Sequence, residues 1–141
     1  LKQIIMKMKS FLLLLSLAFA TFSFAQNNKY QLSSHILDIT LGKPATGVKI
    51  TLSKQDNKGK WEQVDEKYTD NNGRITDFIK QDGKNNTGIY KLTYHTQPYF
   101  KKLEQASFYP FIEVVFELKD NEHYHVPITL SAFGYSTYRG S

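Results

Sequence analysis

Apolar and polar side chains alternate along most of the chain after residue 30, with the two-residue period of a half-buried β-strand. The alternation is clearest over residues 48–52, 90–94, 112–118 and 124–130. Residues 31–39 and 61–68 also have an extended pattern, although apolar side chains occur on both faces of 31–39. Turn-forming residues separate these runs at 42–44, 56–59 and 70–73. The pattern predicts an all-β domain of seven to eight short strands, arranged as a sandwich or a barrel.

Three local features refine this prediction. Residues 98–107 are predicted to form the one short helix, with Pro98 near its start. Asp120-Asn121-Glu122 is predicted to join the strand at 112–118 to the strand at 124–130 as a hairpin. Pro127 interrupts that last strand and cannot donate a ladder hydrogen bond, so it indicates a sheet edge, a bulge or a local break.

The N-terminal segment has the pattern of a secretory signal peptide. Lys7 and Lys9 precede the apolar run at residues 11–20, and Ser23 and Ala25 place small residues at an A-x-A-like cleavage site. An uncleaved anchor is the alternative, but the apolar run is short for a membrane span, which needs about 20 residues. We therefore expect a signal peptide at residues 1–25, a single domain at 26–141, and export to a periplasm.

Removal of the predicted signal peptide would lower the net charge of the chain. The full chain has 18 Lys and Arg against 13 Asp and Glu, a net charge of +5. Three of the lysines lie in residues 1–25, so 15 basic residues face 13 acidic ones and the net charge falls to about +2. This balance gives no reason to expect nucleic acid or a membrane surface as a partner. The absence of cysteine rules out disulfides and thiol chemistry.

The last nineteen residues, 123–141, concentrate the candidate chemistry. His123 and His125 are two positions apart, on the strand face opposite the apolar one. Such a pair can bind a metal together with His35 or His95, can act in acid–base catalysis, or can simply be solvated or hydrogen bonded. The spacing leaves these three readings open. They depend on whether the face is exposed to solvent or covered by another subunit.

Arginine is used sparingly: the chain has 2 arginines against 16 lysines. Arg74 and Arg139 both lie beside glycine-containing turns, and a guanidinium suits two-point recognition of an oxyanion, with a surface salt bridge as the alternative. The chain has neither a G-x-S-x-G elbow nor a phosphate-binding glycine loop. An enzyme of this kind is therefore expected to activate water through side chains and to form no covalent intermediate.

The C-terminal run HYHVPITLSAFGYSTYRGS resembles the signature of 5-hydroxyisourate hydrolases, transthyretin-like proteins that end in Tyr-Arg-Gly-Ser. The runs LSSHILD at 32–38, GKPA at 42–45 and NGRI at 72–75 agree with that family in order and spacing. The departures are mild: Ile128-Thr129 stands for two leucines, Ala132 for a common proline, and Asn72 for the usual aspartate.

The resemblance implies a transthyretin-like (immunoglobulin-like) two-sheet β-sandwich. It also implies a homotetramer, a dimer of dimers, with active sites in the channel between dimers. The implied reaction opens a cyclic amide C–N bond, hydrolysing 5-hydroxyisourate to 2-oxo-4-hydroxy-4-carboxy-5-ureidoimidazoline in urate degradation. Neither a metal nor another cofactor is implied.

Carried over residue by residue, the resemblance gives a specific site. The implied catalytic residues are His35, Arg74, His125 and Ser141. Substrate contacts are implied for His35, Arg74 and Tyr138, whereas His123 is a neighbour with no catalytic role carried over. In our mechanistic hypothesis, the two catalytic histidines orient and deprotonate water and the arginine stabilises the developing negative charge.

A different class of function is the alternative. Exported transthyretin-like domains that bind ligands or partners without catalysis share the Gly-x-Pro-x-x-Gly-Val opening seen at residues 42–48. They lack the His-x-His strand and the Tyr-Arg-Gly-Ser ending, both of which are present here.

Overall fold

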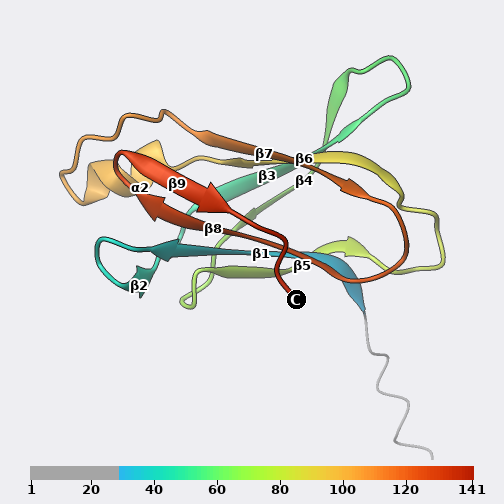
Figure 1. The fold of residues 1–141 in the computed structure, drawn as a ribbon, viewed down its shortest axis with the longest axis horizontal. Coiled ribbons are helices and arrows are strands. Elements are labelled where there is room, and N and C mark those ends of the chain that lie inside the picture. The colour runs from blue at the N-terminus through green and yellow to red at the C-terminus, as the bar shows by residue number, and fades with distance from the viewer. Residues whose placement is uncertain (1–28) are drawn as a thin grey trace, which may run out of the picture.

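The chain forms two facing sheets (Figure 1), and the alternating apolar side chains are buried between them. The computed structural model describes residues 29–141, so the signal peptide predicted at 1–25 lies outside the described residues. The five-stranded sheet contains β1 (Tyr30–Asp38), β2 (Lys43–Pro44), β5 (Arg74–Lys80), β8 (Tyr124–Ser131) and β9 (Gly134–Thr137). The four-stranded sheet has the order β4 (Trp61–Tyr68), β3 (Lys49–Gln55), β6 (Gly88–Tyr94) and β7 (Ile112–Leu118).

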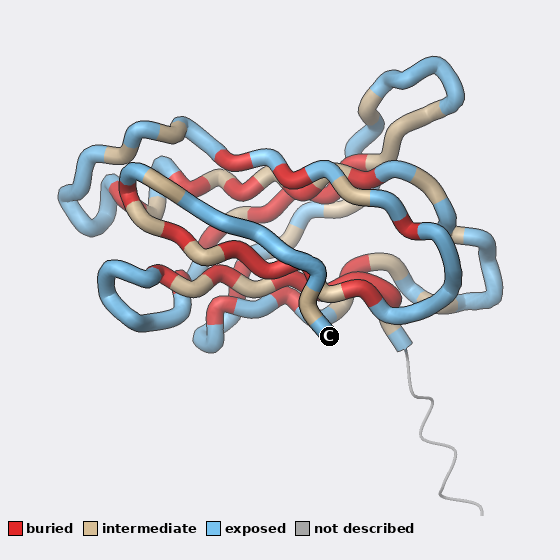
Figure 2. Tube along the Cα trace, viewed as in Figure 1, coloured by how far each residue is buried: buried red, intermediate tan, exposed pale blue. Residues whose placement is uncertain are grey.

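The predicted all-β sandwich is confirmed. Buried positions line the facing sides of the two layers, and exposed positions lie on the loops and outer faces (Figure 2). The apolar positions of β8 are at most 6% exposed, as the alternation predicted. The largest fully buried side chains come from both sheets and include Tyr94, Phe78, Leu32, Ile36, Leu52 and Leu130. Three strands of the described chain had no predicted range: the short β2 and β9, and β5, which leaves the turn predicted at 70–73.

The strand β1 holds the five-stranded sheet together because it pairs with three others. It runs parallel to β8 and antiparallel to β2 and β5. Its mixed faces are explained by two buried polar residues on the inner side. The Ser34 hydroxyl is hydrogen bonded to the Val126 carbonyl and to Tyr94 Oη, and Asp38 accepts a hydrogen bond from Tyr99 Oη. Buried polar groups are tolerated when they are bonded in this way.

The predicted hairpin through Asp120-Asn121-Glu122 is wrong. The strands that it joins, β7 and β8, belong to different sheets, so the segment crosses from one layer to the other. The physical reason is that the preferred partner of β8 is β1, which lies about ninety residues earlier in the chain and pairs with seven consecutive residues of β8. A short polar connection with turn-forming residues is equally compatible with a hairpin and with a crossing between sheets.

The helix is shorter than predicted. It is α2 (Gln97–Lys102), followed by turns and irregular chain up to β7. Pro98 lies in the first turn, as expected, and Phe100 anchors the helix in the core. Glu104 has a positive φ of 53°, which is incompatible with continuation of the helix to residue 107.

Pro127 marks a local break between β8 and the C-terminal segment. The Pro127 carbonyl accepts a hydrogen bond from Thr137 Oγ1, and the His125 carbonyl accepts one from the Gly140 N–H. The ladder to β9 starts at Ile128 and resumes only as a single bridge between His125 and Gly140. The missing N–H of Pro127 therefore faces this gap, and the ladder to β1 on the other side is unbroken.

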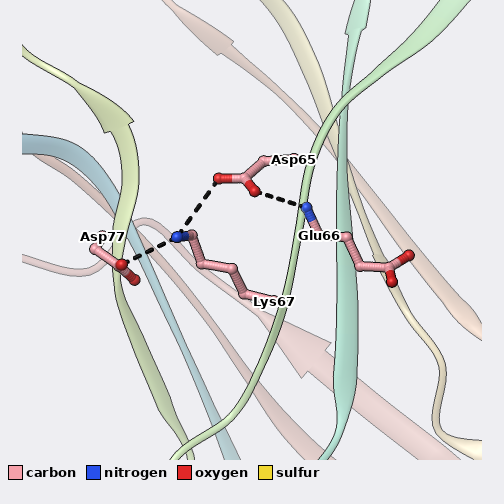
Figure 3. A network of polar contacts seen from close by, with 4 residues as sticks. All are labelled: Asp65, Glu66, Lys67 and Asp77. Carbon is pink, nitrogen blue, oxygen red and sulfur yellow. Dashed lines mark hydrogen bonds and ion pairs between the residues drawn. The ribbon is translucent and has the colours of Figure 1, made fainter.

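A polar contact ties the two sheets together at one edge (Figure 3). Lys67 Nζ on β4 lies 3.0 Å from Asp77 Oδ2 on β5 and 3.8 Å from Asp65 Oδ2 on its own strand. The hydrogen bond to Asp77 raises the pKa of Lys67. The three side chains are partly exposed, so this contact adds little stability beyond that of the core. Over residues 29–141, no helix has the length and apolar character required to cross a membrane.

Candidate active site

Three adjacent strands bring His35, Arg74 and His125 together. On β1, His35 is the register partner of Arg74 on β5, and Ser33 is the register partner of His125 on β8. Directly paired residues share a face of a sheet, and so do residues two apart on one strand. Because Leu32, Ser34 and Ile36 face the core, the site lies on the outer face.

The position of Arg74 is fixed by the turn before it. The Asp70 carboxylate accepts hydrogen bonds from the N–H groups of Asn72 and Arg74. Gly73 has a φ of +70°, and a Cβ at this position would lie 2.6 Å from the Ile36 carbonyl oxygen. The Gly73 carbonyl accepts the Ile36 N–H at 2.9 Å, which holds the turn against β1 beside His35. Only glycine allows both the backbone conformation and this approach.

The imidazole of His125 is held by the C-terminal segment. The Gly140 N–H donates to the His125 carbonyl at 2.8 Å. A Cβ on Gly140 would lie 2.5 Å from His125 Cδ2, so the glycine backbone packs directly against the ring. Ser141 follows as the last residue of the chain, which places the terminus beside the strand that carries His125.

A serine and a second histidine complete the surroundings of His125. The Ser33 hydroxyl lies 2.8 Å from His125 Nδ1 and 2.9 Å from His123 Nε2. The other nitrogen of His123, Nδ1, lies 2.9 Å from the Tyr30 carbonyl oxygen. Ser33 is only 9% exposed and His125 is half-buried, whereas His123 is exposed.

The electrostatics of the site favour neutral histidines. Partial burial is the main cause that lowers the pKa of His35 and of His125, and the nearby Arg74 guanidinium lowers both further. The Asn72 carbonyl and Asp70 partly oppose the shift at His35. A neutral imidazole has one nitrogen lone pair, so both side chains are able to accept a proton near neutral pH.

The metal reading of the histidine pair finds no support in the geometry of residues 29–141. In this part of the chain, no cluster of three His, Asp, Glu or Cys side chains is arranged to hold a metal. His123 and His125 are instead bonded to the same hydroxyl. His95 belongs to the other sheet region, where its Nε2 lies 2.9 Å from the Thr51 hydroxyl.

The remaining residues proposed from sequence lie at a second place. Tyr138 is 60% exposed and, with Arg139, lines a cavity of about 370 Å³ beside β7 and β8. The Arg139 guanidinium lies 4.6 Å from the centroid of the Tyr124 ring, a cation–π contact. Thus Arg74 flanks the histidines, whereas Arg139 packs on an aromatic ring.

Sequence reasoning missed Ser33 and gave His123 no role. Both residues contact His125, but only because β1 pairs in parallel with β8. A signal was available in retrospect: Ser33 and His35 form an i, i+2 pair, as do His123 and His125. The two pairs become neighbours once the register of these strands is known.

Comparisons with known proteins agree with this fold. The model of the HIUase/Transthyretin family matches residues 32–140. A probable 5-hydroxyisourate hydrolase of Caenorhabditis elegans is 48% identical over 111 residues, covering 78% of this chain and 81% of the relative.

Two solved structures share the fold. The Klebsiella pneumoniae 5-hydroxyisourate hydrolase superposes with a TM-score of 0.67 at 35% identity, covering 78% of this chain and 98% of the other. Sea bream transthyretin in complex with thyroxine superposes with a TM-score of 0.72 at 29% identity, covering 78% and 94%. The resemblance read from the sequence is confirmed: the chain belongs to the HIUase/transthyretin family.

Proposed function

We propose that the chain hydrolyses 5-hydroxyisourate to 2-oxo-4-hydroxy-4-carboxy-5-ureidoimidazoline, a step of urate degradation. The relatives named as 5-hydroxyisourate hydrolases support this activity. The structural observation that carries the proposal is the side-by-side placement of His35, Arg74 and His125 on three paired strands. Two neutral bases and one cation on one surface suit hydrolysis of an anionic cyclic amide.

In this mechanism a histidine removes a proton from water, and the resulting hydroxide attacks the ring carbonyl. Arg74 stabilises the negative charge that develops on the carbonyl oxygen. The C–N bond then breaks, and the leaving nitrogen takes a proton from the protonated histidine. From the resemblance, Ser141 is proposed to complete the hydrogen bonding around a catalytic group, and Tyr138 to contact the substrate from the cavity that it lines beside β7 and β8. Acid–base catalysis contributes about 10²–10⁴-fold, and positioning supplies the rest of the acceleration.

Fold similarity does not separate hydrolase from carrier, because a transthyretin superposes as well as a hydrolase does. The residues of the candidate site distinguish the two functions. The outer face of β1 and β8 carries two histidines with lowered pKa values beside a free guanidinium, a composition suited to proton transfer. We therefore favour the enzyme over a non-enzymatic ligand-binding domain.

The assembly that we propose is a homotetramer, a dimer of dimers, in which a second dimer covers the outer face. Large apolar side chains are exposed on several elements of a single chain, as expected of surfaces that bind another copy. They include Phe108, Phe111, Val115, Phe133, Tyr135 and Tyr138, which are 41–72% exposed. We also propose that the protein is exported, with the periplasm as its destination, on the strength of the leader pattern at residues 1–25.

The test is a spectrophotometric assay with freshly generated 5-hydroxyisourate, corrected for the spontaneous decay of this substrate. We expect His125→Ala to lower kcat by at least about a hundredfold, the lower bound for a general acid–base group. The matched control is His95→Ala, since His95 is another half-buried histidine with a lowered pKa and a hydroxyl partner, but in the other sheet region.

Sedimentation velocity on each variant checks that the assembly is retained. A wild-type rate equal to the spontaneous rate would favour the carrier. Near-normal activity of His125→Ala, with an active wild type, would remove His125 from the mechanism.

A further inference from the structure

The hydrogen bonds around His125 form an unbranched chain of four groups. It runs from the Tyr30 carbonyl to His123 Nδ1, from His123 Nε2 to the Ser33 hydroxyl, and from this hydroxyl to His125 Nδ1. The three distances are 2.9, 2.9 and 2.8 Å, all within the normal range for hydrogen bonds. Each member has a defined donor and acceptor capacity, so the direction of the chain follows from its first group.

The Tyr30 carbonyl accepts hydrogen bonds and cannot donate, so Nδ1 of His123 carries the hydrogen. In neutral His123 the other nitrogen, Nε2, then has the lone pair and must accept. The Ser33 hydroxyl donates its single hydrogen to this atom. With that hydrogen used, Ser33 Oγ is left as the acceptor of the hydrogen bond from Nδ1–H of His125. The lone pair of neutral His125 therefore lies on Nε2.

The backbone makes this arrangement rigid. Ser33 and His125 are register partners in the parallel ladder, so the separation of their side chains is set by the sheet. The ring of His125 also packs against Gly140, where there is no room for a Cβ. A 180° rotation of the ring about its Cβ–Cγ bond would place Cδ2 instead of Nδ1 beside Ser33 and break this hydrogen bond.

We propose that Ser33 and His123 are positioning residues that fix His125 in the Nδ1–H tautomer, with Nε2 as the atom that accepts the proton of water. This inference rests on the proposed hydrolysis for its catalytic consequence, and it assigns the general base to His125. It follows the logic by which a partner on one imidazole nitrogen determines the chemistry of the other.

The proposal predicts different values of kcat for two substitutions of Ser33. Ser33→Ala removes the acceptor for Nδ1–H, and we expect kcat to fall about tenfold to a hundredfold, the range seen for partners that orient metal-binding histidines. The KM is expected to change little, because Ser33 is not a substrate contact. Ser33→Thr keeps the hydroxyl and is expected to restore most of kcat.

His123→Leu gives a sharper prediction because His123 is separated from His125 by two hydrogen bonds, through the Ser33 hydroxyl. Without His123 Nε2, the Ser33 hydroxyl is free to donate to His125 Nδ1. The His125 tautomer with hydrogen on Nε2 then becomes populated, and kcat falls although Ser33 is intact. Thr51→Val is the matched control, since it also removes a hydroxyl that is 9% exposed and bonded to a histidine, but far from His125.

The decisive readout is the long-range ¹H–¹⁵N correlation spectrum of the imidazoles, recorded on wild type and on each variant at a pH where His125 is neutral. We expect His125 Nδ1 to be of the hydrogen-bearing type in wild type, Ser33→Thr and Thr51→Val. In His123→Leu we expect the Nε2–H form to appear. A wild-type spectrum with hydrogen on His125 Nε2 would overturn the assignment.

The kinetic test and the spectroscopic test address different claims, so either claim can be refuted while the other stands. If wild type does not accelerate hydroxyisourate decay, the proposed function fails, and the spectrum still tests the tautomer. If wild type is active but Ser33→Ala retains its full kcat, the positioning role is refuted. Loss of folding in Ser33→Ala, monitored by circular dichroism, would shift the kinetic test to His123→Leu and Ser33→Thr, and unchanged kcat and tautomer in His123→Leu would refute it there.

Discussion

Single residues set the proton affinity of the site. Arg74 lies opposite His35 and close to His125, and it lowers the pKa of both imidazoles after burial, the larger cause. A protonated histidine cannot act as a base, so activity is lost as pH falls through the pKa of the base. Because this pKa lies below the ordinary value of 6.5, we expect kcat/KM at pH 6.5 to exceed half of its plateau value and to fall below half only in more acidic solution.

Removal of the guanidinium charge is expected to shift this decline. In Arg74→Gln the positive charge no longer opposes protonation, so the pKa of His125 rises and the acidic limb of the kcat/KM profile moves to higher pH. His125 remains partly buried in this variant, so its pKa returns only part of the way toward the ordinary value. A pH titration of the His125 imidazole by NMR measures the effect without substrate. Lys49→Gln is the control, because Lys49 acts in the same way on the distant His95. An unmoved titration of His125 in Arg74→Gln would contradict this account.

At the scale of elements, the sequence predicted most strands well but predicted poorly which strands pair with each other. The alternation identified the inner faces of β3, β6, β7 and β8 because burial on one face follows directly from the period of side chains. It carries no information on which strand pairs with which, and so the connection from β7 to β8 was misread as a hairpin. The short strand β9 was not predicted because its four residues show no alternation of apolar and polar side chains and bury no apolar side chain in the core.

The candidate site shows the same division. These site residues came from the resemblance, since spacing alone left a metal, a base and an ordinary histidine open; they are His35, Arg74, His125, Ser141 and Tyr138. Ser33 was missed, and the contact of His123 with it was not foreseen, because both contacts exist only in the parallel register of β1 and β8. Local patterns therefore predicted the layers, whereas the hydrogen-bonded chain required the pairing of remote strands.

The turn before β5 offers a test of how one element positions a site residue. Gly73→Ala and Gly47→Ala impose nearly the same backbone strain, since their φ angles are +70° and +68°. An added Cβ meets nothing within 4 Å at Gly47 but meets Ile36 O and Pro44 at Gly73. Strain of this kind costs about 1–3 kcal/mol, so we expect both variants to be destabilised and Gly73→Ala to be destabilised more.

Chemical denaturation measures the free energy of unfolding for both glycine variants, and the hydroxyisourate assay measures activity. Because the Gly73 turn holds Arg74 opposite His35, its variant is expected to lose activity even where it remains folded. Gly47→Ala is expected to retain activity. Equal losses in the two variants would mean that the close approach to Ile36 is unimportant.

At the scale of the whole molecule, the proposed tetramer places the C-terminus in a closed channel. Ser141 follows the residue that bridges to His125, so any added chain starts at the site. We expect a tag after Ser141 to reduce activity far more than a tag placed before Gln26, the residue that follows the predicted signal peptide. Both forms are compared by the hydroxyisourate assay, and by sedimentation velocity for their assembly. Equal activity of the two forms would contradict the proposed role of the terminus.

The parallel pairing of β1 with β8 also determines when this fold is able to form. Ser33 and His125 are 92 positions apart, and the strand that completes the middle of the five-stranded sheet is nearly the last to be synthesised. Contacts of such high order form late and fold slowly, because the loop must close before they are made. A nascent chain that lacks residues 124–141 has no partner for the exposed edge of β1. We expect such a chain to complete its fold only after residues 124–130 have been made, a delay that is compatible with the proposed export.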